Sequence, residues 1–412
     1  QLGYFKQINE QDQQAMKVDK TAGRDNAVDV TLKFEEQNRN QLTFGAGVSQ
    51  YEGVFAQLGF QTANFLGRGE SLTVSVQAGD RAQNYQVAFT EPFLFDRNIT
   101  GGVDLYKRAL QYIGYYTQKS TGGNLTFGFP VADFSRMFVN YSYERVRMTD
   151  LNEALIDQSC LASSDGCSTF VYDSLLIGQG GQRTVSKIVP SFVHNTIDNP
   201  IFPNTGARLT TSVDLAVLGG NTQFYKPRLE AIWYRRHLTR TSFGFRGMTE
   251  YISPLGGTTS LPIFERLFLG GENSIRGFDI RSVGPTVPGS QLVLGGNQSL
   301  LFNAEYLISI ANPVRLILFF DAGQVRDFGQ SFSWKEDLTT LVYPSPPLLL
   351  DPFASVSLTE GTALPSAKAE VIGQTNAFKT STGLEVRFYM PVLNVPFRLI
   401  YSFNPSRGGV LD

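Results

Sequence analysis

The chain has 412 residues, of which 35 are Lys or Arg and 37 are Asp or Glu, so its formal net charge is −2. This balance argues against a nucleic-acid-binding protein, which normally carries a basic excess. No run approaches the roughly 18 apolar residues that a spanning helix requires, which excludes a helical transporter. The 40 Gly, 32 Phe and 17 Tyr beside only 2 His instead suit many strands joined by turns.

The first 40 residues differ from the rest of the chain. Val28, Val30 and Leu32 alternate with polar residues, which predicts a short strand, and residues 4–9 could be its partner across a polar stretch. So short a segment cannot bury a core of its own. The N-terminus also lacks the basic start and apolar segment of a signal peptide. We interpret residues 1–40 as the tail of a soluble domain in a mature or truncated chain.

From residue 41 onward, apolar and polar residues alternate with the period of a strand. Between 299 and 310, for example, Phe302 and Tyr306 fall on an apolar face, and Asn303 and Glu305 fall on a mainly polar one. The same pattern predicts fifteen strands, at 41–50, 53–62, 70–79, 84–92, 99–109, 113–129, 136–149, 182–196, 206–217, 222–238, 240–253, 299–310, 313–326, 378–390 and 394–404.

Two all-β architectures could produce this pattern: a soluble sandwich or propeller, or a membrane barrel. The connections alternate between tight turns and long loops, the longest at 150–182, 254–298 and 327–377, as in outer-membrane barrels. The polar faces also carry charges, such as Arg246 and Arg387, that fit a wet lumen better than a dry sandwich core. The sequence therefore favours an all-β fold, a transmembrane antiparallel β-barrel.

The two cysteines, Cys160 and Cys167, lie in one polar stretch at 157–169. Two thiols in one exposed loop more often form a local disulfide in an oxidising compartment than a metal site, which needs further ligands nearby. We therefore predict a Cys160–Cys167 disulfide and no metal site; a free thiol pair is the alternative.

A specific motif lies in the long connection before residue 299. Residues 269–278 read Leu-Gly-Gly-Glu-Asn-Ser-Ile-Arg-Gly-Phe, which resembles the Arg-Gly-Phe/Tyr loop motif of the BamA family of outer-membrane insertases. Three further segments resemble the same family in order and spacing: the turn Phe202–Gly206, the pair Gly296-Asn297, and the strand segment Phe319–Gly323. A lone Arg-Gly-Phe would be weak evidence, but the set covers essentially the whole chain.

The resemblance implies a domain organisation. Residues 1–40 would be the C-terminal part of the last POTRA domain, a small α+β module, and residues 41–412 would form the barrel, with loop 254–298 folded into its lumen. The family has 16 strands and ends on an aromatic residue, whereas 15 strands can be predicted here and the chain ends at Asp412. We therefore expect the closing strand to lie outside this sequence.

The resemblance also implies a contact inside the barrel. Glu305 and Asp321 fall on the polar faces of adjacent predicted strands, so both carboxylates should face the lumen, where Arg276 could reach them with a planar fork that Lys cannot match. Gly277 would let the backbone pass close to the wall, and Phe278 would wedge the loop tip against it. The alternative is an exposed glycine-rich loop with an incidental Arg.

The function implied is not catalysis, and no cofactor is expected. The family inserts β-barrel proteins into the bacterial outer membrane through a seam between its first and last strands, with unfolded barrel proteins, lipids and accessory lipoproteins as partners. The seam strand would comprise Leu42, Thr43, Phe44, Gly45, Ala46, Gly47 and Val48. Its glycines could weaken the pairing or mark a barrel-corner kink, and the residues alone favour neither.

Three other functions compete with this one. A polypeptide-exporting or TamA-like barrel of the same superfamily would differ mainly in segments before Gln1. An outer-membrane enzyme is disfavoured because His194 and His237 are the only histidines and neither G-x-S-x-G nor H-E-x-x-H occurs. A general porin is disfavoured because the long loop, its Arg and the acidic partners of that Arg suit a filled lumen. The sequence assigns no role to the insertion 327–377.

Overall fold

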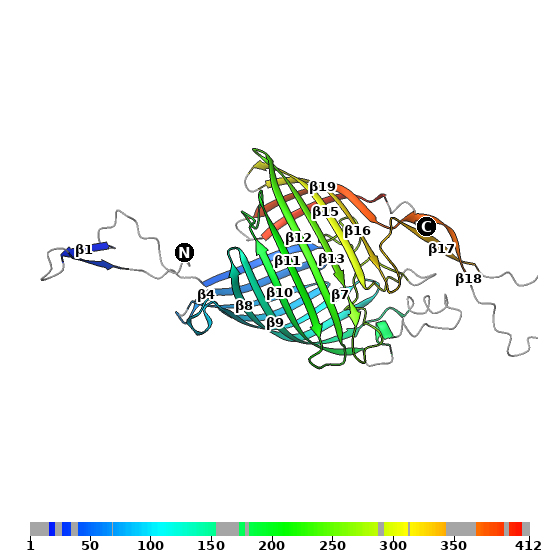
Figure 1. Ribbon diagram of the computed structural model, residues 1–412, viewed down its shortest axis with the longest axis horizontal. Coiled ribbons are helices and arrows are strands. Elements are labelled where there is room, and N and C mark those ends of the chain that lie inside the picture. The colour runs from blue at the N-terminus through cyan, green and yellow to red at the C-terminus, as the bar shows by residue number, and fades with distance from the viewer. Residues whose placement is uncertain are drawn as a thin grey trace, which may run out of the picture.

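The structure is a computed structural model that describes residues 16–20, 27–33, 40–67, 69–153, 173–177, 181–286, 292–311, 314–342, 368–390 and 395–405. Most of these residues form long strands tilted around a single barrel (Figure 1). The wall strands are β3 (Asn40–Ser49), β4 (Gly53–Phe65), β5 (Glu70–Gly79), β6 (Ala82–Glu91), β7 (Thr100–Tyr112), β8 (Tyr116–Ala132), β9 (Ser135–Thr149), β10 (Gln182–Asn195), β11 (Gly206–Ala216), β12 (Phe224–Leu238), β13 (Thr241–Tyr251), β15 (Gln298–Ala311), β16 (Val314–Arg326), β19 (Lys379–Met390) and β20 (Val395–Phe403).

The fifteen predicted strands are confirmed, and their ends differ from the prediction by at most three residues. Each wall strand pairs antiparallel with its neighbour in chain order, from β3 at one end of the path to β20 at the other, and the two-residue β14 (Ser253–Pro254) pairs with β12 beside the path. Within the described ranges, no ladder joins β3 to β20. We call the boundary between these two strands the seam.

The two faces of the wall differ as a membrane barrel requires. In β16, the Phe320 side chain is 45% exposed on the outer face, whereas its neighbours Phe319 and Asp321 are buried on the lumenal face. The same alternation exposes Phe302 on β15 and Leu384 on β19. A ring of exposed aromatic and aliphatic side chains around a polar interior suits a wall that faces hydrocarbon. The predicted fold class, an all-β transmembrane barrel, is confirmed.

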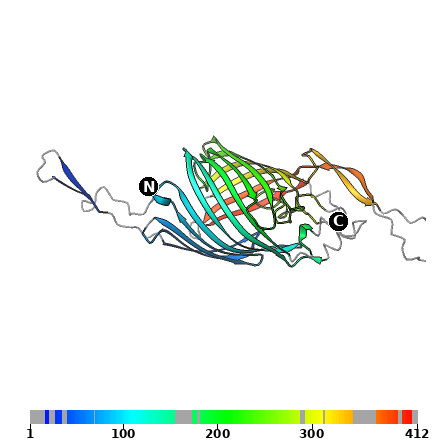
Figure 2. The same cartoon turned by 60° about the horizontal axis from the view of Figure 1, so that its bottom comes forward.

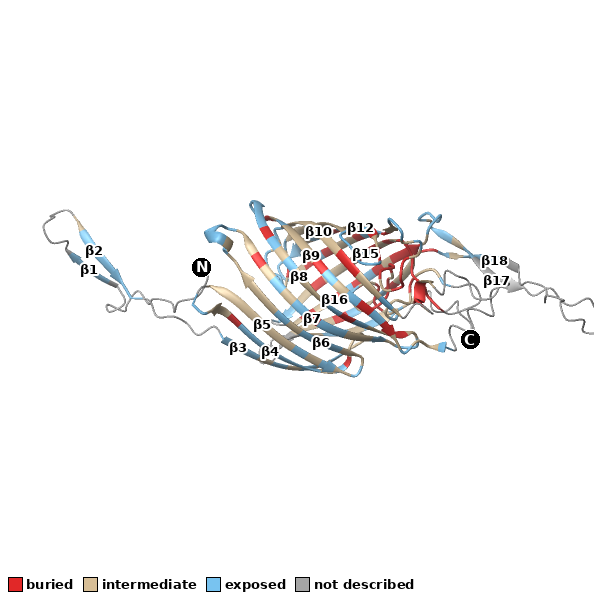
Figure 3. Cartoon of the chain, turned by 90° about the horizontal axis from the view of Figure 1, so that it is seen from below, coloured by how far each residue is buried: buried red, intermediate tan, exposed pale blue. Residues whose placement is uncertain are grey.

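The hydrophobic core lies inside the barrel, near one rim. Loop residues such as Leu269, Ile275 and Val283 pack against lumenal wall residues such as Leu301 and Val325 in one buried cluster. Figure 3 shows the buried residues concentrated at this end of the barrel. Each fully buried aliphatic side chain contributes roughly 1.5 to 3 kcal/mol relative to an exposed one. The segment between β13 and β15 is therefore a packed plug rather than a free surface loop.

Two hairpins project beyond opposite ends of the barrel (Figure 1, Figure 2). At the N-terminal end, β2 (Val28–Leu32) pairs with β1 (Met16–Lys20), a partner that the sequence did not predict. Residues 4–9, the predicted partner, lie outside the described residues. At the other end, β17 (Lys335–Val342) pairs with β18 (Lys368–Asn376). Only a long loop was predicted at 327–377, so this hairpin was not predicted.

The remaining local features are few. A short 3-10 turn, η1 (Leu94–Asp96), connects β6 to β7. In the part of the chain that the structure describes, no helix has the length and apolar character needed to cross a membrane. Cys160 and Cys167 lie outside the described residues, so the disulfide stays a prediction.

Candidate functional site: a lumenal loop anchored to the wall

The loop between β13 and β15 reaches the wall through a closed tip. Leu269 and Val283 exchange backbone hydrogen bonds of 3.0 and 3.1 Å, and the Gly271 N–H donates to the Phe278 carbonyl at 3.0 Å. Residues 271–278 therefore form a tip, and its bonded base holds its shape. This is the segment that carries the Arg-Gly-Phe motif.

Arg276, at the end of this tip, is buried against three acidic side chains. Its Nε and Nη2 donate to the two Asp321 carboxylate oxygens at 2.8 and 2.7 Å, a bidentate fork. Its Nη1 donates to Glu305 at 2.8 Å and to Glu385 at 2.9 Å, and the guanidinium lies 3.8 Å from the centre of the Phe319 ring. Burial alone would lower the pKa of Arg276, but the Asp321 hydrogen bonds and the Glu305 charge raise it, so the group stays charged.

The structure thus brings together Arg276, Glu305 and Asp321, the three residues that the sequence singled out, and adds a fourth. Glu385 on β19 is fully buried and also accepts hydrogen bonds from Arg387 at 2.9 Å and Arg398 at 2.7 Å. Its position on the polar face of the predicted strand already indicated a side chain that faces the lumen. The sequence could not show that the register of β16 with β19 carries Glu385 to Arg276.

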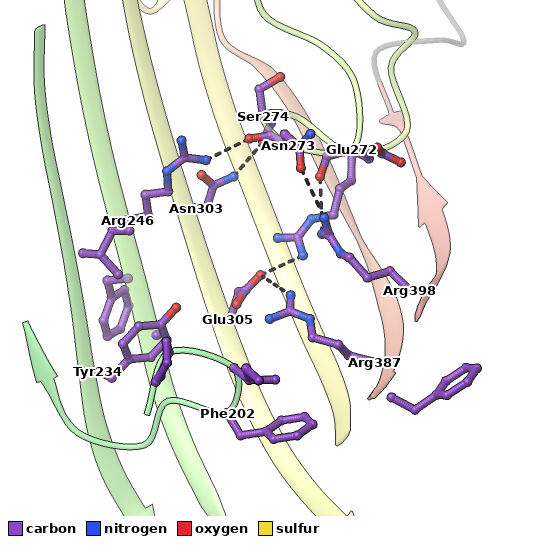
Figure 4. A pocket seen from close by; sticks show the side chains of 17 residues that line it. Phe202, Tyr234, Arg246, Glu272, Asn273, Ser274, Asn303, Glu305, Arg387 and Arg398 are labelled. Carbon is purple, nitrogen blue, oxygen red and sulfur yellow. Dashed lines mark hydrogen bonds and ion pairs between the residues drawn. The ribbon is translucent and has the colours of Figure 1, made fainter. Parts of the chain in front are cut away.

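Polar side chains from other strands hold the backbone of the tip. Arg246 on β13 donates to the Asn273 carbonyl at 2.8 Å, and Asn303 on β15 donates to the Ser274 carbonyl at 2.8 Å. Arg398 on β20 donates to the Glu272 carbonyl at 3.3 Å. Figure 4 shows these side chains converging on residues 272–274. The tip is therefore fixed along its length by side chains from five wall strands: β13, β15, β16, β19 and β20.

The two residues after Arg276 contact the seam. Gly277 has φ +86°, and a Cβ at this position would lie 2.7 Å from the Ser402 hydroxyl of β20, so a side chain would meet both strain and a close neighbour. Phe278 packs partly buried against the core cluster, and its carbonyl accepts from Gln50, just after β3, at 3.4 Å. The tip thus touches both ends of the strand path.

The predicted seam strand corresponds to β3. Its outward residues Leu42, Phe44 and Val48 are exposed. Thr43, Gly45 and Gly47 fall on the lumenal side and Ala46 on the outer side. A Cβ at Gly47 would lie 2.8 Å from the Phe55 ring of β4, so this glycine makes room for an aromatic side chain. This packing role differs from both roles predicted for the glycines of this strand. A cavity of about 860 Å³ lies along the seam, lined by residues of β3, β20 and the loop tip.

The turn that resembles the family motif closes the lumen from the other rim. Arg315 on β16 is buried and donates to the Pro203 carbonyl at 2.7 Å, to the Phe202 carbonyl at 3.1 Å and to Asn204 Oδ1 at 2.9 Å. A lumenal cavity of about 690 Å³ is lined by both this turn and the loop tip; Figure 4 shows Phe202 at its lower boundary. Loop and turn therefore restrict the lumen at two levels.

Asp198 shapes this turn from within. Its Oδ1 accepts the backbone N–H groups of Asn199 and Asn204 at 2.9 Å each and of Thr205 at 3.2 Å. Slight burial acts to raise the pKa of Asp198, but these three donors outweigh it and lower the pKa. The charged carboxylate therefore organises the turn that Arg315 holds.

The histidines occupy ordinary wall positions. His194 Nδ1 lies 2.8 Å from the Ser135 hydroxyl, and His237 Nδ1 lies 3.0 Å from the Tyr306 hydroxyl. Among the described residues, no group of three His, Cys, Asp or Glu side chains could hold a metal ion. The site is thus an array of paired charges that fixes a loop in place.

A membrane β-barrel with a lumenal loop anchored to its wall by an Arg-Gly-Phe motif defines a class of protein. The model of the Omp85 superfamily domain matches residues 64–408, and the chain belongs to this superfamily. The chain is 25% identical over 321 residues to the outer membrane protein assembly factor BamA of Nitratidesulfovibrio vulgaris, which covers 76% of this chain and 38% of that protein. It is 28% identical over 298 residues to the sorting and assembly machinery component 50 homolog of Bos taurus, covering 71% and 58%.

A solved structure agrees with the fold. The BamA of Haemophilus ducreyi lacking POTRA domains 1–3 superposes with a TM-score of 0.71 at 20% identity, covering 98% of this chain and 73% of that one. The resemblance to the BamA family drawn from the loop motif is confirmed. The chain spans well under half the length of that first BamA relative.

Proposed function

We propose that this protein resides in the bacterial outer membrane and inserts β-barrel proteins into it through the seam. The observation that carries the proposal is the anchored loop tip, which lies inside the lumen and contacts β20 through Gly277 and Gln50, the residue after β3, through Phe278. A strand edge without a partner presents N–H and C=O groups that can pair with an incoming strand. Relatives named as assembly factors support the same activity.

The proposed mechanism needs no bond chemistry. An unfolded client strand would pair with the edge of the first strand, β3, when the seam opens, and its outward side chains would face lipid directly. The fixed loop tip would keep the lumen occupied while the seam widens, so that the membrane stays sealed. We propose accordingly that the protein acts without catalysis or a cofactor, and that accessory lipoproteins bind mainly to segments outside the barrel.

We further propose that residues 1–40 are the C-terminal part of a POTRA domain. Support comes from their position directly before β3 and from the β1–β2 hairpin, which lies beyond the barrel rim (Figure 1). The solved BamA structure of Haemophilus ducreyi lacks POTRA domains 1–3, so POTRA domains belong to that protein. On this arrangement the hairpin end is periplasmic, and the rim that carries β17–β18 is extracellular.

Reconstitution tests the proposal directly. The chain is inserted into liposomes, an unfolded outer-membrane β-barrel protein is added, and the rate of formation of its protease-resistant folded form is compared with that in protein-free liposomes. Faster folding is expected with the wild type and with Arg108→Ala, which removes an exposed side chain of β7, and little acceleration with Arg276→Ala. No acceleration by the wild type would refute the proposal.

A parallel measurement addresses the porin alternative. The loop and the turn at 202–204 restrict the lumen from both ends, so planar-bilayer recordings should show small or intermittent conductance. Large, steady channels would favour a porin, and translocation of a polypeptide across the liposome membrane would favour an exporter.

A further inference from the structure

A second arginine, just after the loop tip, anchors the loop on the opposite side of the seam. Arg281 lies five residues after Arg276, and its Nη1 donates to the Tyr116 hydroxyl of β8 at 2.8 Å. The guanidinium stacks 3.8 Å from the centre of Phe268 and 4.6 Å from the centre of Tyr112, at the end of β7. Nη2 donates to the Ile263 carbonyl. An aromatic cage thus holds this side chain against the β7–β8 wall.

The backbone at Arg281 is held in an uncommon conformation. Its φ is +59°, in the left-handed region that non-glycine residues rarely adopt and that persists only where surrounding contacts impose it. The cage supplies these contacts. A cavity of about 390 Å³ lined by Tyr51, Tyr112, Tyr115 and Tyr116 adjoins the cage, so the side chain has space into which it could move if it were released.

Between the two arginines, the chain also contacts the start of the strand path. Gln50 donates to Asp279 Oδ1 at 3.1 Å. Residues 276–281 therefore cross from the β16–β19–β20 side of the seam to the β3–β8 side. The Arg276 end is bound to three carboxylates, whereas the Arg281 end is bound to a neutral hydroxyl, a carbonyl and aromatic faces. Both guanidinium groups donate charge-assisted hydrogen bonds, but only Arg276 also gains the Coulomb attraction of opposite charges.

We infer that residues 276–281 form a strap across the seam whose Arg281 end releases when the seam opens, while Arg276 stays attached to the β16–β19 wall. The inference rests on the proposed function only in taking the seam as the moving boundary. Arg281 is then a positioning residue: it contacts no client, and its aromatic cage sets how readily the two sides of the seam separate.

Hydrogen exchange read by mass spectrometry tests the strap in the full chain in nanodiscs, without any client. Arg281→Ala should speed exchange of peptides within residues 277–286 by about tenfold or more, as expected for the loss of a hydrogen bond and a desolvated cation–π stack, while peptides within 267–276 keep wild-type protection. Arg281→Lys, which keeps the charge, should give an intermediate effect. Arg108→Ala is the matched control, because Arg108 stacks at 4.0 Å on Tyr106 of its own strand.

Spin labels measure the seam itself. In a Cys160→Ser/Cys167→Ser background, labels at the exposed positions Leu105 on β7 and Leu384 on β19 report the separation across the seam. Arg281→Ala should broaden this distribution toward longer distances, and Arg108→Ala should not. Unchanged exchange and distances in both Arg281 variants, or loss of protection throughout 267–286, would overturn the inference. Neither readout needs insertion activity, so failure of the proposed function in liposomes would be seen separately.

Discussion

Replacement of Arg276 by alanine should lower the free energy of unfolding, mainly because the Asp321 carboxylate loses its charged partner. Glu385 keeps Arg387 and Arg398 as partners, and Glu305 is partly exposed. Asp321 is fully buried and would retain only the Asn303 amide and the residue 276 backbone N–H. Removal of one partner of a buried ion pair costs about 3 to 5 kcal/mol. We expect Arg276→Ala to fall in this range.

A double-mutant cycle isolates the cause. Arg276→Ala/Asp321→Ala removes the orphaned charge together with its partner, so it should be less destabilised than the sum of the two single variants. Arg276→Lys should be intermediate, because an ammonium group cannot reproduce the fork on Asp321.

The assay is guanidinium unfolding of the barrel in lipid vesicles, combined with limited proteolysis of residues 254–298. Arg276→Ala should remain inserted but gain cleavage sites within the loop. A loss below about 1 kcal/mol, the scale of an exposed pair, with an unchanged cleavage pattern, would refute the reasoning.

Three further outcomes are expected. Gly277→Ala should lower the melting temperature by more than Gly329→Ala, since both glycines have positive φ but only the former has close neighbours; equal shifts would mean that contact with the seam contributes nothing. Arg315→Ala should speed amide exchange within residues 196–205 while leaving loop 254–298 protected, and retained protection of the turn would contradict its anchoring role. Because the folded-state pKa of Asp198 is lowered, the stability it contributes should be present at neutral pH and be lost as pH falls below about 4, the ordinary Asp range. Asp198→Asn should flatten this part of the pH profile of the melting temperature, which a wild-type-like profile would disprove.

The wall could be predicted from sequence because its pattern is enforced locally. Each strand has one face toward lipid and one toward the lumen, so a charged side chain on the lipid face costs free energy of folding. The alternation of apolar and polar residues therefore persists over every wall strand. The hairpin β17–β18 and the strand β1 escaped prediction for the opposite reason. The described side chains of the N-terminal hairpin are exposed on both faces, so no burial requirement marks its sequence.

The site was predictable only in part, because it depends on contacts distant in sequence. Arg276 could be predicted because it belongs to the Arg-Gly-Phe motif, and Glu305 and Asp321 could be predicted because they fall on the polar faces of their strands. Glu385 lies 109 residues from Arg276, and its approach is set by the register of β16 with β19, which alternation does not specify. No sequence motif identified Arg281. Its cage is formed only when residues of β7, β8 and the loop come together in the folded protein.

The use of charge rather than apolar packing to hold the loop has a physical rationale. A well-packed apolar substitute for a buried ion pair is often as stable or more stable, so stability alone does not explain the arrangement. Apolar contacts, however, tolerate a shift of one residue. The Arg276 guanidinium must bind Asp321 through two nitrogens while its third nitrogen binds Glu305 and Glu385. This geometry admits a single position of the tip. That position places Gly277 against β20 and Phe278 beside Gln50. The charge cluster therefore sets the register of the loop relative to the seam. Under the proposed function, a seam that opens repeatedly requires the loop to return to that register each time.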